Sequence, residues 1–98
     1  MKLTIDGKPY DVPVLNAADY EDFEDMLRKT ADSELHFIDR NKAVVGILAS
    51  KMQRTYPELE LIQIKRSITM PQLMPMFNWI CLGKNDEAQP PTAESPKS

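Results

Sequence analysis

The segment from Val44 to Gly83 constrains the fold of this chain more than any other. Apolar residues recur along it at helical spacing, and the pattern breaks at Tyr56-Pro57 and at Ile68-Thr69. The two breaks leave three short helical units, each with an apolar stripe that must pack against something. Because the segment holds no histidine and no glycine-rich loop, it predicts protein binding rather than chemistry.

The chain has 98 residues, the length of one domain with a modest core. We therefore expect a single globular domain over residues 1–84. The apolar runs are far shorter than the roughly 18 residues of a membrane span. The N-terminal MKLTIDG also lacks the apolar core of a secretory signal. The sequence thus predicts a cytoplasmic protein without a membrane anchor, and its single cysteine, Cys81, predicts a buried, inert thiol.

The net charge of −3 is unevenly distributed. Residues 1–39 hold ten acids and four bases, whereas residues 40–66 hold two acids and six bases. Acidic and basic helices can face each other or solvent within one monomer. Alternatively, opposite patches pair between subunits and produce a homo-oligomer. Both arrangements stay open.

Residues 1–14 predict a β-hairpin, since Asp6-Gly7 is the dipeptide that a two-residue type I′ turn prefers. This turn places Ile5 opposite Lys8. A lone hairpin is unstable in water, so its apolar face must pack against the helices or against a partner's sheet. The remaining cross-strand pairs follow as Thr4/Pro9, Leu3/Tyr10, Lys2/Asp11 and Met1/Val12.

Residues 17–30 predict the first helix, with Asn16 as its N-cap and acids near its positive end. We expect a buried stripe made of Tyr20, Phe23, Leu27 and Ala31. Five acids of this helix predict a solvated face rather than a metal site, because they lack the spacing of a calcium-binding loop. They are Asp19, Glu21, Asp22, Glu24 and Asp25.

Residues 39–56 predict a long second helix, capped by Asp39 or Ser33 and ended by Pro57. Gly46 costs about 1 kcal/mol relative to alanine in mid-helix and indicates close helix packing. His36 has no potential ligand or catalytic partner near it in sequence, so a surface or core histidine is expected. The apolar stripe comprises Val44, Val45, Leu48, Met52 and Tyr56.

Residues 58–66 suit either a strand or a short helix, because their apolar positions alternate only in part. We favour a helix, since Pro57 is a preferred first helical residue and the charges run from Glu to Lys. As a strand, this segment would extend the hairpin. The partly alternating positions are Leu59, Leu61, Ile62 and Ile64.

Residues 70–82 predict a last helix that Thr69 caps and Gly83 ends. Pro71 is tolerated in the first turn, but Pro75 should kink or fray the helix. Residues 85–98 contain three prolines and no large apolar residue, so a disordered tail is expected. The residues of the last helix expected in the core are Leu73, Met76, Phe77, Ile80 and Cys81.

Together these elements predict an α+β fold that is mainly α-helical. An N-terminal β-hairpin packs on three to four short helices, and a disordered C-terminal tail follows. The order of the parts resembles the small tail assembly chaperones of long-tailed bacteriophages and prophages, over about residues 1–84. The matching residues are Leu3, Ile5, Gly7 and Tyr10, then Tyr56, Pro57 and Leu59, and then Leu73, Phe77, Ile80 and Gly83.

The resemblance implies a non-enzymatic binding protein of the bacterial host cytoplasm. Such a protein binds the tape measure protein, helps to recruit the major tail protein, and is absent from the finished virion. The resemblance transfers no catalytic residue and no cofactor, and such genes often encode a longer frameshifted product. A methionine-rich groove suits this role, although the same side chains suit core filling equally well. The candidate groove residues are Met52, Tyr56, Met74, Met76, Phe77 and Trp79.

Two other classes of protein compete with this hypothesis. The first is a phage connector or structural protein, which would remain in the particle. The second is a nucleic-acid-binding regulator, although the overall acidity argues against it. An enzyme is not expected, because no nucleophile lies beside a base and no phosphate loop or metal-ligand spacing is present. The basic residues on which a regulator would depend are Arg40, Lys42, Lys51, Arg54, Lys65 and Arg66.

Overall fold

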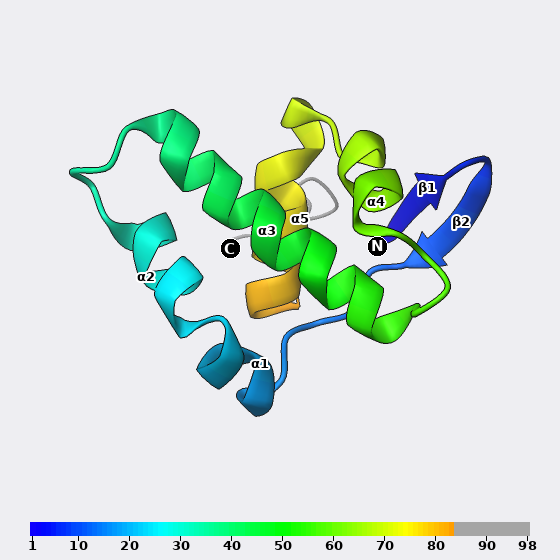
Figure 1. The fold of residues 1–98 in the computed structure, drawn as a ribbon, viewed down its shortest axis with the longest axis horizontal. Coiled ribbons are helices and arrows are strands. Elements are labelled where there is room, and N and C mark those ends of the chain that lie inside the picture. Colours follow the sequence, from blue (N-terminus) through cyan, green and yellow to red (C-terminus); the bar gives the residue numbers. More distant parts are fainter. Residues whose placement is uncertain (84–98) are drawn as a thin grey trace, which may run out of the picture.

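The computed structural model describes residues 1–83 and confirms the expected fold class, an N-terminal hairpin packed on helices (Figure 1). The predicted tail, residues 85–98, lies outside the described residues. Helix α3 crosses the whole molecule, with the hairpin and α2 on opposite sides of it. The elements are β1 (Lys2–Ile5), β2 (Lys8–Asp11), α1 (Ala17–Asp22), α2 (Glu24–Ala31), α3 (Phe37–Thr55), α4 (Leu61–Ser67) and α5 (Met70–Leu82).

The β-hairpin has the predicted register. Asp6 and Gly7 adopt φ angles of 51° and 82°, as a type I′ turn requires at both central positions. The strands pair antiparallel with Ile5 opposite Lys8 and Lys2 opposite Asp11, so every cross-strand pair predicted within the strands is confirmed. Leu3 and Ile5 of β1 are buried, and β1 packs against α4. The hairpin therefore uses the helices, rather than a partner's sheet, to cover its apolar face.

The predicted helix over residues 17–30 is two helices, because the chain turns at Phe23. Asn16 is the N-cap, as expected. Its Oδ1 accepts from the Asp19 N–H at 2.9 Å, and its own N–H donates to Asp19 Oδ2 at 2.8 Å. Of the predicted stripe, Phe23 is buried and Leu27 is half-buried. The turn at Phe23 reorients α1, which leaves Tyr20 exposed, and Ala31 is also exposed.

Asp19 was expected on a solvated face, but it is only 2% exposed. Its carboxylate pairs with Lys51 Nζ at 2.7 Å and with the Arg54 guanidinium at 3.2 Å. Arg54 also pairs with Asp22 at 2.8 Å and lies over the Phe23 ring, 4.6 Å from its centroid. These side chains fasten α1 to the C-terminal half of α3, so one predicted surface acid is part of the core.

The Asp19 carboxyl is held in its charged form by these neighbours. Burial by itself would raise the pKa of Asp19. The hydrogen bonds from Lys51 and from the Asn16 N–H, together with the charges of Lys51 and Arg54, outweigh burial and lower this pKa. The ion pair is therefore intact at neutral pH.

Helix α3 begins two residues earlier than predicted. Neither Asp39 nor Ser33 caps it, because the Nδ1 atom of the exposed His36 accepts from the Ile38 N–H at 3.2 Å. His36 is thus a surface histidine with a capping role. Of the predicted stripe, Val44, Leu48 and Met52 are buried, whereas Val45 and Tyr56 are half-buried.

Gly46 marks a close approach between α2 and α3, as its position in mid-helix indicated. A Cβ atom added at Gly46 would lie 3.2 Å from the sulfur of Met26. Met26 is half-buried beside a surface depression, so its flexible side chain has room to move.

Replacing Gly46 by alanine should therefore raise the free energy of unfolding by about 0.5 kcal/mol, because the gain in helix propensity exceeds the cost of moving Met26. Urea denaturation followed by circular dichroism measures the change. Gly46→Leu is the control, since its larger side chain has no such space and should destabilise the protein. A destabilised alanine variant would show that Met26 is held rigidly.

Residues 61–67 form helix α4, so the helical interpretation is confirmed over the strand. The helix begins three residues later than expected. Pro57 lies outside it in a turn that Leu59 N–H closes on Tyr56 O at 3.0 Å. Glu60 is the N-cap, and its N–H donates to Gln63 Oε1 at 2.8 Å.

Helix α5 has the predicted bounds and caps, with Thr69 N–H donating to Gln72 Oε1 at 3.1 Å and Gly83 at a φ of 69°. The expected fraying at Pro75 is wrong, since the helix runs through it from Met70 to Leu82, whereas the expected kink stays a prediction. The missing N–H of Pro75 would have met the carbonyl of Pro71 in the exposed first turn, where water can solvate that carbonyl.

The core face of α5 is largely the predicted one. Leu73, Met76 and Ile80 are buried, whereas Phe77 and Cys81 are half-buried. Burial nevertheless raises the pKa of the Cys81 thiol. Across residues 1–83 we find no helix with both the length and the apolar character that a membrane crossing requires.

Candidate functional site

The six predicted groove residues do not form one surface. Met52 and Met76 are 1% and 2% exposed and belong to the core. Tyr56 and Trp79 hold the end of β2 and the residue after it, since Tyr56 Oη donates to Asp11 O at 2.8 Å and Trp79 Nε1 donates to Val12 O at 2.6 Å. These four side chains therefore stabilise the fold.

Met74 and Phe77 differ from the other four predicted residues. They line a pocket of about 240 Å³ together with residues of α3. Met74 is 52% exposed, whereas Phe77 is half-buried. Only Met74 among the six predicted residues thus lies fully on the surface, at the edge of a larger apolar region.

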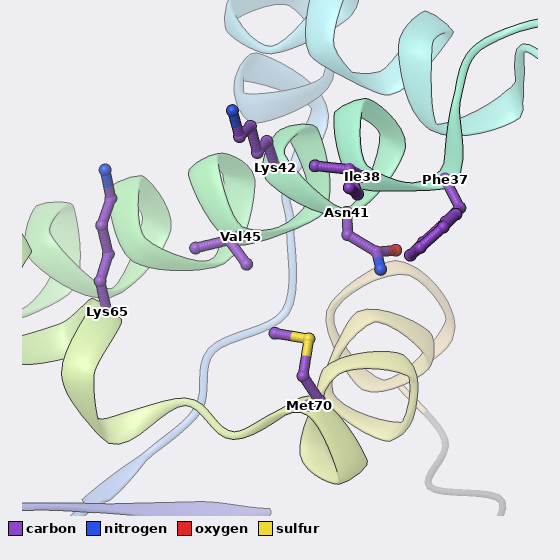
Figure 2. Close-up of a pocket in the computed structure, with 7 residues that line it drawn as sticks. All are labelled: Phe37, Ile38, Asn41, Lys42, Val45, Lys65 and Met70. Atoms are coloured by element: carbon purple, nitrogen blue, oxygen red, sulfur yellow. The ribbon is translucent and has the colours of Figure 1, made fainter.

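An apolar depression lies between the N-terminal half of α3 and the start of α5 (Figure 2). Its volume is about 530 Å³, and the end of α4 closes one side. Three apolar side chains on its walls are exposed to an unusual degree: Phe37 by 58%, Ile38 by 48% and Met70 by 62%. We call this depression the α3–α5 groove, and its lining residues are Phe37, Ile38, Asn41, Lys42, Val45, Lys65 and Met70.

The local sequence explains how these walls form. Because His36 caps α3, Phe37 and Ile38 become the first residues of the helix and project from its first turn. Asn41 and Val45 follow one and two turns later on the same side. Thr69 is the N-cap of α5, so Met70 is the first residue of this helix. The Met70 side chain lies on the opposite wall (Figure 2).

The rim of the groove is basic. Lys42 and Lys65 line it, and no acid is among the lining residues. Within residues 1–83, neither lysine makes an ion pair, whereas Lys2, Arg28, Lys51 and Arg54 each do. The groove therefore offers an apolar floor together with two cations that no described acid neutralises.

The basic residues that a nucleic-acid-binding regulator would use lie in different surroundings. Lys51 is buried and Arg54 is paired with Asp19 and Asp22, so both are occupied within the fold. Lys42 and Lys65 lie on the groove, and Arg40 lines the neighbouring pocket. Two of the six basic residues are therefore already neutralised within the fold.

The α3–α5 groove has an apolar floor and few polar groups in its lining. Its lining has no histidine, cysteine, serine or carboxylate that could act as nucleophile or base. Among the residues that the structure describes, no three His, Cys, Asp or Glu side chains are grouped to hold a metal ion. An apolar floor with few polar groups is typical of a helix-in-groove interaction.

The groove is not evident from the predicted elements, because the predicted helix begins at residue 39 and leaves residues 37–38 outside it. The signal was present: Phe37, Asn41, Val45 and Leu48 repeat at spacings of four, four and three. This pattern extends the helical period back beyond Asp39.

Comparison with known proteins yields no match to a protein-family model, a curated protein or a solved structure.

Proposed function

We propose that this protein is a non-enzymatic tail assembly chaperone of a long-tailed bacteriophage or prophage. In this role it binds the tape measure protein in the bacterial host cytoplasm, helps to recruit the major tail protein, and is absent from the finished virion. The observation that supports the proposal is the α3–α5 groove, whose exposed Phe37, Ile38 and Met70 have no cover in the described chain. The choice of protein family in this proposal depends on the sequence resemblance over about residues 1–84.

The dimensions of the groove suit a helical partner. Its α3 wall runs from Phe37 to Val45, which is about 12 Å at the helical rise per residue. A partner helix would thus be contacted over two to three turns, with anchor residues at spacings of three and four. Met70 and the adjoining Met74 provide flexible, polarisable contacts that adapt to different apolar side chains. Reversible cover of a long helical protein requires such adaptability.

Co-expression with the tape measure protein of the same phage or prophage tests the proposal. We expect the wild-type protein to keep the tape measure protein soluble and to co-purify with it. Met70→Glu should reduce the co-purified amount by about tenfold or more, because a charge on an apolar wall must be desolvated on binding. Both measurements use the amount of tape measure protein in the soluble, affinity-purified fraction.

Leu82→Glu is the matched control, since Leu82 is 68% exposed and does not line the groove. It should co-purify like wild type, and both variants should unfold at the wild-type urea concentration. An insoluble, unbound tape measure protein beside a folded small protein would contradict the chaperone function. Fixed copies of the small protein in purified virions would instead identify a connector.

A further inference from the structure

We infer that the occupant of the α3–α5 groove is an acidic amphipathic helix of the partner, with carboxylates placed to meet Lys42 and Lys65. This inference rests on the proposed function in taking the groove as the partner site. It adds the charge of the partner segment, which the proposed function does not specify.

Charge complementarity is the first argument for an acidic occupant. Lys42 and Lys65 both line the groove, and neither pairs with an acid within residues 1–83. A basic helix in the groove would bring like charges together in a partly desolvated space, which disfavours the complex. An acidic helix would instead pair with both lysines as it covers the apolar floor.

The placement of the two lysines indicates where the carboxylates lie. Figure 2 shows Lys65 and Phe37 at opposite ends of the groove, with Lys42 on the α3 side. Phe37 and Ile38 lie toward the end away from Lys65, and Met70 lies on the α5 wall between the two ends. The occupant should therefore carry apolar side chains at i, i+3, i+4 and i+7, with its acids along the α3 side and at the Lys65 end.

A second copy of this chain fits the groove poorly. In a twofold dimer through the groove, Lys42 and Lys65 of one copy would face the same two lysines of the other copy. The acidic surface on α1 and α2 has the right charge, but Tyr20 is its only large exposed apolar side chain among the described residues. It has no stripe with which to fill the groove.

The C-terminal segment of the chain is also an unsuitable occupant. Residues 84–98, KNDEAQPPTAESPKS, contain no large apolar residue that could cover Phe37, Ile38 or Met70. Residues 84–98 therefore lack the apolar stripe that the groove requires.

Three fluorescent peptides with helix-favouring sequences test the inference by anisotropy against the full-length chain. The first carries leucines at i, i+3, i+4 and i+7 with glutamates on the flanks. The second has lysines in place of the glutamates, and the third has the composition of the first with the stripe scrambled. We expect the acidic peptide to bind at least about tenfold more tightly than either of the others, with a preference over the lysine peptide that falls as salt rises.

Charge reversal of one groove lysine provides the decisive comparison. Lys65→Glu should remove most of the preference for the acidic peptide, and Lys42→Glu/Lys65→Glu should favour the lysine peptide. Lys8→Glu is the matched control: Lys8 is an exposed lysine on β2 that does not line the groove. Equal binding of the acidic and lysine peptides, or a preference unchanged by Lys65→Glu, would overturn the inference. A dimer in sedimentation experiments that Met70→Glu dissociates would overturn it in favour of a second copy.

The outcomes also separate this inference from the proposed function. If co-purification of the tape measure protein depends on Met70 but not on the sign of the charge at residue 65, the chaperone function stands and the inference of an acidic occupant is wrong. If the acidic peptide binds through Lys65 but the tape measure protein does not co-purify, the proposed function is wrong and the groove serves another acidic helix.

Discussion

Replacing Asp19 by alanine is expected to lower the free energy of unfolding by about 3 kcal/mol, the scale on which removal of one partner destabilises a buried ion pair. The side chain of Asp19 is 3% exposed and that of Lys51 is 11% exposed, so the substitution leaves a nearly buried ammonium group without its anion. It also removes the side chain that accepts from the Asn16 N–H at the start of α1. Urea denaturation at pH 7 measures the loss.

Asp22→Ala is the control for Asp19, because Asp22 pairs with the same Arg54 but has a half-exposed side chain. Its loss of stability should be far smaller, since water solvates the groups left behind. Lys51→Met in the Asp19→Ala background should recover part of the stability by removing the unpaired buried charge. Similar losses for Asp19→Ala and Asp22→Ala would mean that burial adds nothing to this pair.

The same carboxyl gives the protein an acid-sensitive component of stability. Because the native pKa of Asp19 is lowered, its contribution is complete above the unfolded pKa of about 3.9 and is lost as pH falls through the native value. The stability difference between wild type and Asp19→Asn should thus stay constant from about pH 5 to pH 7 and shrink below about pH 4. A difference that stays constant down to pH 3 would contradict the lowered pKa.

Local signals determined the parts of the fold that could be predicted. Asp6 and Gly7 supply the two positive φ angles that a type I′ turn requires. Once the turn is placed, the antiparallel pairing of the two strands follows from it. Asn16 and Thr69 cap helices through bonds to residues three positions away, so they too are visible in sequence. Each of these features depends on neighbours along the chain.

The features that were missed depend on contacts between distant segments. Asp19 is buried because Lys51 and Arg54, more than thirty residues away, face it from α3. The break at Phe23, over whose ring Arg54 lies, turns α1 toward those cations. Spacing along one helix cannot reveal these partners, and acids spread around a helix are ordinarily solvated.

The candidate site shows the same division between local and distant information. Met74 could be placed near the exposed side of α5, but Met52 and Met76 have the same side chain and lie in the core. Helical spacing identifies an apolar stripe without saying whether a neighbouring helix covers it. Phe37 and Ile38 are 58% and 48% exposed at the first turn of α3, where the Phe37 ring lies against the neighbouring His36 ring with 4.6 Å between the ring centroids. Their exposure is a property of the assembled fold.

Ile64→Ala should also have a large effect, lowering the free energy of unfolding by about 3 kcal/mol. Ile64 is fully buried at 0% exposure, and α4 packs against both α3 and β1. Truncation would therefore leave a cavity where the hairpin meets the helices. Urea denaturation gives the stability, and the loss should appear at a single transition seen by circular dichroism and by Trp79 fluorescence alike.

Ile62→Ala provides a matched control in the same helix, since the same side chain there is 49% exposed. We expect it to cost less than about 0.5 kcal/mol. Comparison of the Ile62 and Ile64 variants also tests whether this segment is a helix or a strand. In a strand, residues 62 and 64 point to the same face and should have comparable effects. In a helix they lie about 200° apart, so one is buried and the other is exposed. Comparable losses for both variants would therefore contradict helix α4, whereas a large loss confined to Ile64 is the result that the helix requires.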